Sequence, residues 1–172
     1  MRKFTTKDLT LAAMVAALYA VMSYFGNVFG LTYGPIQLRF SEALCVLPFL
    51  FPATAPGLFV GCLAANLLSP YGPLDIVVGS LATLIAAVWT SRVKRRWLAP
   101  LPPVVCNTVL VGFTIAFAQA GVTAALPAAW LYNGLTVGVG ELGACYVLGM
   151  LLLKLLPRVD YFKPMIAPKE TA

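Results

Sequence analysis

The sequence contains no histidine, and only 10% of its 172 residues are charged. Without an imidazole side chain, the chain has neither a histidine general base nor a histidine-ligated metal site. Soluble domains carry about a quarter charged residues, whereas 60% of this chain is hydrophobic and its mean hydropathy is +0.88. One soluble core of this size would not hide so much apolar surface. The composition therefore predicts an all-α integral membrane protein with one domain.

Two familiar motifs are also missing. The sequence has no G-x-x-x-x-G-K-[ST] segment, so the chain has no P-loop of its own for ATP. It has no C-x-x-C pair, and its four cysteines stand singly in apolar runs. They are Cys45, Cys62, Cys106 and Cys145. We interpret them as small apolar side chains, and we expect no disulfide framework, no metal site and no cofactor.

The net charge of +6 comes from basic residues that gather in three segments. They are Arg2, Lys3 and Lys7, then Arg92, Lys94, Arg95 and Arg96, then Lys154, Arg158, Lys163 and Lys169. These segments flank apolar stretches, as cytoplasmic loops do under the positive-inside rule. We therefore expect both termini and the middle basic loop to be cytoplasmic in a multi-pass protein of the plasma membrane. Lipid is the expected surrounding, and no nucleic acid is expected as a partner.

Glycine and proline divide the apolar sequence into six predicted helices. They cover residues 7–26, 40–51, 56–68, 74–91, 104–120 and 127–156. Six crossings place all three basic segments on one side of the membrane, in agreement with the charge rule. A full crossing needs about 20 apolar residues, so the second and third helices are short and could form one broken or re-entrant pair.

Both ends of the chain need a separate interpretation. The first residues resemble a signal peptide, with basic residues before an apolar run. We interpret this segment as a retained first helix, capped by Thr6 or Asp8. We expect a single transmembrane domain over residues 1–156, followed by a loose, polar cytoplasmic tail over residues 157–172.

Seven polar residues stand inside the apolar sequence, most of them near the predicted outer ends of helices. They are Gln37, Arg39, Glu42, Asn66, Asp75, Asn133 and Glu141. Intramembrane polar residues are costly and face a bundle interior or a cavity, so we predict a polar pocket that opens outward. Asn133, Val137 and Glu141 share one helical face, with Glu141 about 12 Å deeper than Asn133. Asn107 is expected nearer the cytoplasmic half.

Structural roles remain open for several of these residues. Arg39 and Glu42 are three residues apart and could pair with each other. Asp75 could be a helix cap, and Asn66 and Asn133 could form interhelical hydrogen bonds. Glu141 is different, because no basic residue stands within two helical turns of it. We therefore interpret Glu141 as functional.

Small residues four positions apart predict flat helix faces. Gly57, Gly61 and Ala65 form one such face, and Gly134 and Gly138 form another; both suit packing inside the bundle. The first helix has two adjacent rows, made of Ala12, Ala16 and Ala20 and of Ala13 and Ala17. Two rows exceed the need of one neighbouring helix, so we hypothesise that this face docks on a partner protein.

Four segments carry a resemblance to a known family: IQLRFSEALCVLPFLFPATAPGLFVGCLAANLL, LDIVVGSLATLIAA, LAPLPPVVCNTVLVG and GLTVGVGELGACYVLG. They resemble the queuosine-precursor transporter (QueT) family, whose members are substrate-binding S components of energy-coupling factor (ECF) transporters. The similarity covers about residues 9–155. Pro73 departs from the family pattern, in the turn before the fourth helix.

The resemblance implies a six-helix S component that captures its ligand from outside. It also implies an ECF transmembrane coupling subunit and two ATPase subunits, with the alanine face of the first helix docked on the membrane subunit. ATP hydrolysis outside this chain fits the missing P-loop. The implied ligand is a queuosine precursor, which is a 7-deazaguanine.

The guanine edge of such a ligand has two adjacent N–H donors and a carbonyl acceptor. A carboxylate matches the donor pair, and an arginine or an amide matches the carbonyl. Aromatic residues in or near the predicted outer loops could stack on the ring. They are Tyr33, Tyr71, Trp130 and Tyr132.

An enzyme is a different class of function for such a chain. An intramembrane hydrolase without histidine needs a Ser–Lys pair or paired carboxylates, and no Ser and Lys fall together within the predicted membrane segments. Glu42 and Glu141 could pair only if the fold brought them close. We therefore expect no enzyme. An S component for another vitamin or nucleobase stays open, as does an assembly subunit that binds no small molecule.

Overall fold

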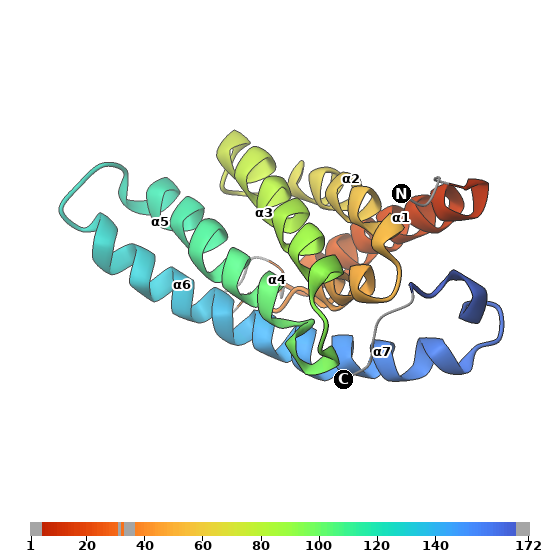
Figure 1. The fold of residues 1–172 in the computed structure, drawn as a ribbon. Coiled ribbons are helices and arrows are strands. Elements are labelled where there is room, and N and C mark those ends of the chain that lie inside the picture. The colour runs from red at the N-terminus through yellow and green to blue at the C-terminus, as the bar shows by residue number, and fades with distance from the viewer. Residues whose placement is uncertain (1–4, 31, 33–36, 168–172) are drawn as a thin grey trace.

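The computed structural model describes residues 5–30, 32 and 37–167 (Figure 1). Every regular element in these ranges is helical, which confirms the predicted all-α class. Four helical stretches are long and apolar enough to cross a membrane: Thr6–Val28, Pro73–Arg92, Arg96–Ala120 and Leu126–Arg158. The structure therefore has the length and composition of an all-α membrane protein.

The first two long stretches are single helices, α1 (Thr6–Val28) and α3 (Pro73–Arg92). The other two each contain a π-helical segment. The third consists of α4 (Leu101–Cys106), η4 (Asn107–Val111) and α5 (Gly112–Ala120). The fourth consists of α6 (Leu126–Leu142), η5 (Gly143–Gly149) and α7 (Met150–Leu155). Figure 1 shows α5 and α6 side by side as a hairpin, and α6 running on into α7.

Two short elements lie between α1 and α3. The 3₁₀ helix η1 (Phe40–Phe49) has ten residues and α2 (Ala55–Asn66) has twelve. At about 2.0 and 1.5 Å per residue, each is shorter than the ~30 Å hydrocarbon layer. Their shortness was predicted, and a six-fold crossing of the membrane stays a prediction. Brief 3₁₀ turns complete the chain at Pro52–Thr54, Arg96–Leu98, Leu156–Arg158 and Lys163–Met165.

The starts of α1 and α3 differ in detail from those predicted from the sequence. The side chain of Thr5 caps α1, and Asp8 completes a capping box by accepting from the Thr5 backbone N–H at 2.9 Å. The expected cap at Thr6 or Asp8 is therefore corrected to Thr5. Pro73 opens α3, where its fixed φ suits the first helical turn, directly after Gly72 with φ of 79°.

The outer surface is apolar, unlike that of a soluble protein, and several polar side chains are buried inside the bundle. The outer faces of α1, α3 and α6 carry exposed large apolar side chains, such as Phe25 at 61%, Ile85 at 52% and Leu135 at 62%. Polar side chains such as Ser41, Thr83 and Thr114 are buried inside. Apolar surface of this extent needs an apolar surrounding, which is the arrangement of a membrane protein.

The small residues of α2 meet α1 directly. A Cβ atom on Gly57 would lie 2.1 Å from the Ala12 carbonyl oxygen, and one on Gly61 would lie 2.7 Å from that of Ala16. Ala12 is buried in this contact, so its predicted place on a docking face is corrected to internal packing. Ala13 and Ala17 are exposed, and Ala20 is half-buried.

The C-terminal residues that the structure describes pack against the bundle. Met165 is buried, the Ala167 N–H donates to the Leu50 carbonyl at 2.8 Å, and the rings of Phe51 and Phe162 lie 5.8 Å apart. The sequence predicted a loose tail here, because proline and polar residues are frequent. These apolar contacts involve the described part of the tail, and its looseness stays a prediction.

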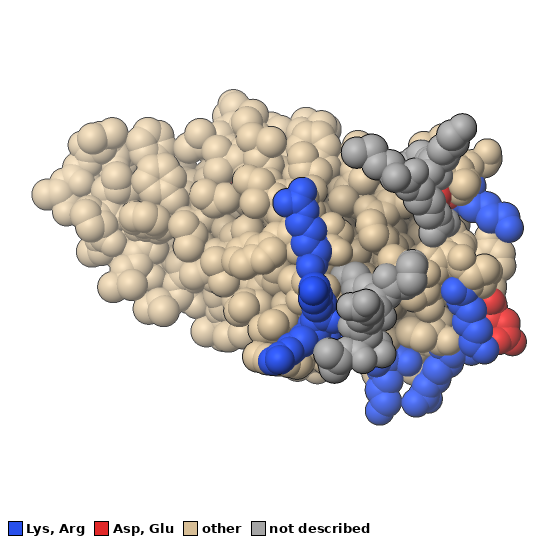
Figure 2. All heavy atoms as spheres, in the orientation of Figure 1, with Lys and Arg blue, Asp and Glu red and all other residues tan. Residues whose placement is uncertain are grey.

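Basic residues gather toward one end of the molecule. Figure 2 shows Lys and Arg side chains over the part of this face that includes α7 and the end of α3. Arg92 lies in the last turn of α3 and Lys154 in the last turn of α7. The α5–α6 hairpin forms the opposite end in this view, and its visible face is free of blue. Basic side chains are therefore distributed unevenly along the molecule. The positive-inside rule predicts such an asymmetry for a protein that spans the membrane.

Candidate functional site

Glycines on α6 and η5 let the chain around η1 lie directly on that helix. A Cβ atom on Gly140 would lie 1.9 Å from the Gln37 carbonyl oxygen. One on Gly149 would lie 2.8 Å from Cγ1 of Val46. Real Cβ atoms essentially never approach so closely, so only glycine fits at these positions. This contact brings the polar residues at the start of η1 against the middle of the fourth long stretch.

Three of the predicted site residues meet where η1, α2 and α3 come together. Arg39 Nη1 donates to Asn66 Oδ1 at 3.4 Å, and Nη2 lies 3.8 Å from Asp75 Oδ2. Asn66 Nδ2 donates to the Asp75 carbonyl oxygen at 3.2 Å. All three side chains are buried. Polar residues from three separate segments therefore converge here, whereas a polar pocket that opens outward stays a prediction.

These contacts decide two of the open alternatives. Asp75 is no helix cap, since the N-cap of α3 is Gly72 and the Asp75 carboxylate accepts from the Ser69 hydroxyl at 2.5 Å. Asn66 does bond across helices, as the structural alternative proposed. At the rim of the cluster, Gln37 Nε2 donates to the Tyr71 hydroxyl at 3.1 Å.

Glu42 lies one turn further along η1 and is 1% exposed. Its Oε1 accepts a hydrogen bond from the hydroxyl of Tyr19 on α1, and its Oε2 lies 3.0 Å from the Cys45 thiol. Arg39 forms its ion pair with Asp75, and the Glu42 carboxylate is held by these neutral donors. The sequence spacing of three residues between Arg39 and Glu42 was therefore no guide to their partners.

Glu141 is buried between α6 and η4. Asn107 Nδ2 donates to Glu141 Oε1 at 2.8 Å. The Cys145 thiol lies 3.5 Å from Glu141 Oε2 and 3.4 Å from the backbone carbonyl oxygen of Glu42. The Cys145 thiol therefore lies between the Glu42 backbone and the Glu141 carboxylate.

Asn133 lies apart from this cluster. Its amide donates to Gln119 Oε1 at 2.9 Å on α5 and to the Ala129 carbonyl at 2.8 Å. Asn133, Val137 and Glu141 do share one buried face of α6. Asn133, however, forms a hydrogen bond across the α5–α6 hairpin to Gln119, so its contacts are those of the structural alternative.

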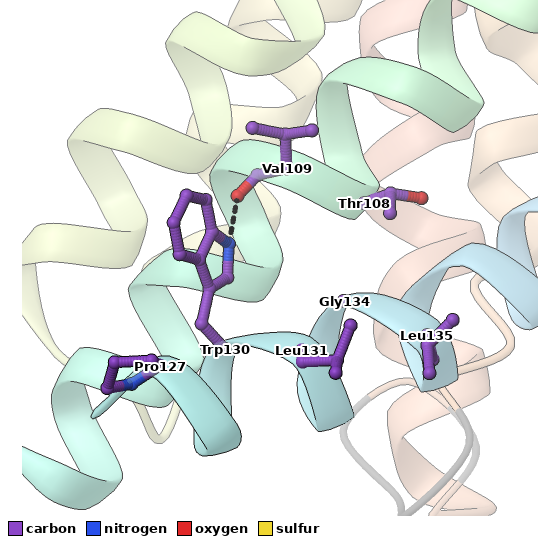
Figure 3. Close-up of a pocket in the computed structure, with 7 residues that line it drawn as sticks. All are labelled: Thr108, Val109, Pro127, Trp130, Leu131, Gly134 and Leu135. Carbon is purple, nitrogen blue, oxygen red and sulfur yellow. Dashed lines mark hydrogen bonds between the residues drawn. The ribbon is translucent and has the colours of Figure 1, made fainter. Parts of the chain in front are cut away.

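The aromatic residues expected to stack on a ligand fall in different places. Tyr71 contacts Gln37, whereas Tyr132 is 63% exposed on the outer surface. Trp130 lines a groove of about 230 Å³ between α6 and η4, where its indole N–H donates to the Val109 carbonyl at 3.0 Å (Figure 3). This groove has no charged lining residue and does not suit a polar base. Tyr33 lies outside the described residues.

Sequence reasoning missed two members of the site, Tyr19 and Asn107. Tyr19 is fully buried. The only signal for it in the sequence was a hydroxyl group that has no obvious partner in an alanine-rich helix. Asn107 was placed nearer the cytoplasmic half and was left out. Two cysteines interpreted as small apolar side chains, Cys45 and Cys145, also contact carboxylate oxygens.

The site therefore combines three carboxylates, one guanidinium and two amides inside a shell of lipid-facing apolar side chains. In the part of the chain that the structure describes, no three Cys, Asp or Glu side chains are placed to bind a metal ion. A buried polar site among apolar helices is typical of an integral membrane protein that binds or transports a polar ligand.

Comparison with known proteins gives the family. Residues 9–158 match the model of the QueT transporter family, and the chain belongs to that family. It is thus a membrane transporter and not an enzyme. The queuosine precursor transporter QueT of Lactococcus lactis subsp. cremoris (strain MG1363) is 30% identical over 172 aligned positions, which cover 93% of this chain and 98% of that protein. No solved structure matches the chain.

Proposed function

We propose that this chain is the substrate-binding S component of an ECF importer and captures a queuosine precursor, a 7-deazaguanine, from outside. One observation carries the proposal: the buried convergence of Arg39, Glu42, Asp75 and Glu141 in a member of a transporter family. The name of the Lactococcus relative supports the substrate class.

The donor and acceptor groups of the site suit a guanine edge. A carboxylate accepts the two adjacent N–H groups of the base, and the Arg39 guanidinium or a neighbouring amide donates to its carbonyl. Asn66 and Asn107 supply amides next to the carboxylates. Asp75 Oδ1 and Asn107 Oδ1 are buried and have no hydrogen-bond partner among the described residues. A buried polar atom needs such a partner, and the ligand would supply it.

Native mass spectrometry of the purified protein tests this function, followed by isothermal titration with 7-deazaguanine precursors. A co-purified 7-deazaguanine, or its binding with 1:1 stoichiometry, is the expected result. If another vitamin or nucleobase binds and no 7-deazaguanine does, the substrate assignment is wrong. If no small molecule binds, the chain is an assembly subunit.

The proposed partners are an ECF transmembrane coupling subunit and two ATPase subunits. The chain has no P-loop, so another protein must hydrolyse ATP if transport is ATP-driven. The exposed row of Ala13 and Ala17 on α1 is the proposed contact with the membrane subunit, because small side chains let helices approach closely.

Leucine at Ala13 or Ala17 is expected to weaken association with the coupling subunit by about tenfold or more, since overpacking a close contact costs about 1–3 kcal/mol. Ligand binding should be retained. Co-purification of the coupling subunit measures the effect. Val77→Leu adds bulk at an exposed position of α3 and should change nothing. If Ala13→Leu and Ala17→Leu both assemble normally, the docking face lies elsewhere.

We further propose that both termini and the Arg92–Arg96 loop face the cytoplasm. In intact cells, a membrane-impermeant thiol reagent should label Val122→Cys, which is 86% exposed in the wild-type chain, in the turn before α6. It should label Lys94→Cys and Asp160→Cys only after permeabilisation. The four native cysteines are buried, so unmodified protein is the control. Labelling of Lys94→Cys in intact cells would contradict this topology, because it would place the Arg92–Arg96 loop outside.

A further inference from the structure

A groove lies on the outer surface of α3, at the opposite end of the helix from the buried polar cluster. It has a volume of about 460 Å³ and is lined by Leu84, Ile85, Val88, Trp89 and Arg92. Leu84, Val88 and Arg92 follow each other at intervals of four residues, so they lie on one side of the helix. Ile85 is 52% exposed and Trp89 is 44% exposed. The groove is therefore an open, apolar surface with one cation at its end.

The cation at the end of the groove belongs to a group without counter-charges. Four exposed basic residues stand within five positions: Arg92, Lys94, Arg95 and Arg96. The acidic side chains in the described ranges lie elsewhere, in the capping box of α1, beside Lys163 and inside the buried cluster. None of them forms an ion pair with the four cations. The C-terminus of α3 supplies about half a negative charge, which the four cations exceed.

The groove crosses the boundary between the hydrocarbon layer and the lipid headgroups. α3 has 20 residues, and at 1.5 Å per residue it is about as long as the hydrocarbon layer is thick. Arg92, its last residue, therefore falls at the level of the headgroups, and Leu84 lies about 12 Å deeper. Trp89 and Trp97 stand on either side of Arg92 in the sequence and are both exposed, as is typical of tryptophan at a membrane interface.

We propose that this groove binds an anionic phospholipid, with its phosphate on Arg92 and the neighbouring cations and one acyl chain along the apolar wall. A guanidinium group matches phosphate oxygens in a bidentate geometry, and basic pockets at membrane surfaces bind acidic headgroups. A free phosphate would leave the apolar wall unused, and a zwitterionic lipid would bring an ammonium group next to four cations. This lipid site does not involve the ligand of the buried cluster, so the inference goes beyond the proposed function.

Two lipids that differ only in the headgroup test the proposal. They are phosphatidylglycerol, which is anionic, and phosphatidylcholine with the same acyl chains, which is zwitterionic. Native mass spectrometry of the whole chain, delipidated in detergent, measures the affinity of each. Phosphatidylglycerol should bind at least about tenfold more tightly. Glycerol phosphate, which has no acyl chain, should not displace it.

A charge variant and its control locate the headgroup. Arg92→Gln should reduce the preference for phosphatidylglycerol about fivefold, which corresponds to the ~1 kcal/mol that one cation contributes near an anionic lipid. Lys154→Gln removes the same charge from the last turn of α7 and should keep the preference. The ratio of the two affinities is the readout, because partial misfolding lowers both equally.

A second pair of variants locates the acyl chain. Val88→Trp fills the groove and should weaken the binding of both lipids about tenfold. Val77→Trp adds the same bulk about three turns away on α3, at a residue that is 56% exposed and outside the groove. It should leave both affinities unchanged.

Three results would overturn the proposal. Equal binding of the two lipids by the parent would show that the cations do not select the headgroup. A preference that survives in a variant combining Arg92→Gln, Lys94→Gln, Arg95→Gln and Arg96→Gln would place the lipid elsewhere. If the parent binds both lipids equally and the combined variant no longer co-purifies with the coupling subunit, the basic surface contacts an acidic protein instead.

Discussion

Gly140→Ala is expected to remove ligand binding and to destabilise the fold by about 3 kcal/mol, at the upper end of overpacking effects. The added methyl group would lie 1.9 Å from the Gln37 carbonyl oxygen, 2.7 Å from its carbon and 3.4 Å from the Leu38 nitrogen. Main-chain atoms have no alternative rotamer, so the segment that leads into Arg39 must move away from α6. The polar cluster at the start of η1 would move with it.

Gly143 provides the matched control for this change. It lies three residues further along the same stretch, and a Cβ atom there would lie 3.6 Å from Cδ1 of Leu38, an ordinary contact. Gly143→Ala should therefore keep the melting temperature and the ligand affinity close to those of the parent. Thermal unfolding in detergent and isothermal titration measure both variants. Equal behaviour of the two variants would contradict the close approach at Gly140.

The second large effect is expected for Arg39→Ala. Removing the guanidinium leaves the Asp75 carboxylate without its cation and Asn66 Oδ1 without this donor, both fully buried. Breaking a buried ion pair from one side costs about 3–5 kcal/mol. Arg39→Lys keeps the charge but not the planar fork, so it should weaken ligand binding less than Arg39→Ala does.

An exposed ion pair in the same chain serves as the comparison. Lys163 Nζ lies 2.5 Å from Asp160 Oδ1, with side chains 58% and 91% exposed. Lys163→Ala should cost less than about 1 kcal/mol, since surface pairs contribute little. If Arg39→Ala and Lys163→Ala melt at the same temperature, the buried pair adds no stability. If Arg39→Ala does destabilise the fold, adding Asp75→Ala should restore part of the loss, because it removes the orphaned charge.

The sequence was informative about the elements and about where polar residues gather. Hydropathy and the placement of glycine and proline predicted the long helices and the two short segments, because an apolar run must be long enough to cross lipid. The convergence of Arg39, Asn66 and Asp75 followed from the rule that intramembrane polar residues face inward. These inferences depend only on local composition and on a membrane as solvent.

The partners of each residue could not be read in the same way. Arg39 and Glu42 are neighbours along η1, yet Arg39 forms its ion pair with Asp75 and Glu42 accepts a hydrogen bond from Tyr19. Asn133 was grouped with the site because of its depth, but it bonds to Gln119 on the adjacent helix. Such choices depend on how the helices are rotated and on close contacts at single glycines, which periodicity does not specify.

The π-helical segment η5 sets a constraint on chain length. A π turn holds one residue more than an α turn, and η5 lies between two tight glycine contacts, Gly140 on Gln37 and Gly149 on Val46. The π segment already holds one extra residue, so adding another there would turn everything beyond by about 100° and shift it by about 1.5 Å. One contact would then be lost whichever was kept. The exposed turn over residues 121–125 has no such pair of anchors, so evolution is free to lengthen or shorten the chain there, whereas the residues from Gly140 to Gly149 act as a spacer that cannot be lengthened.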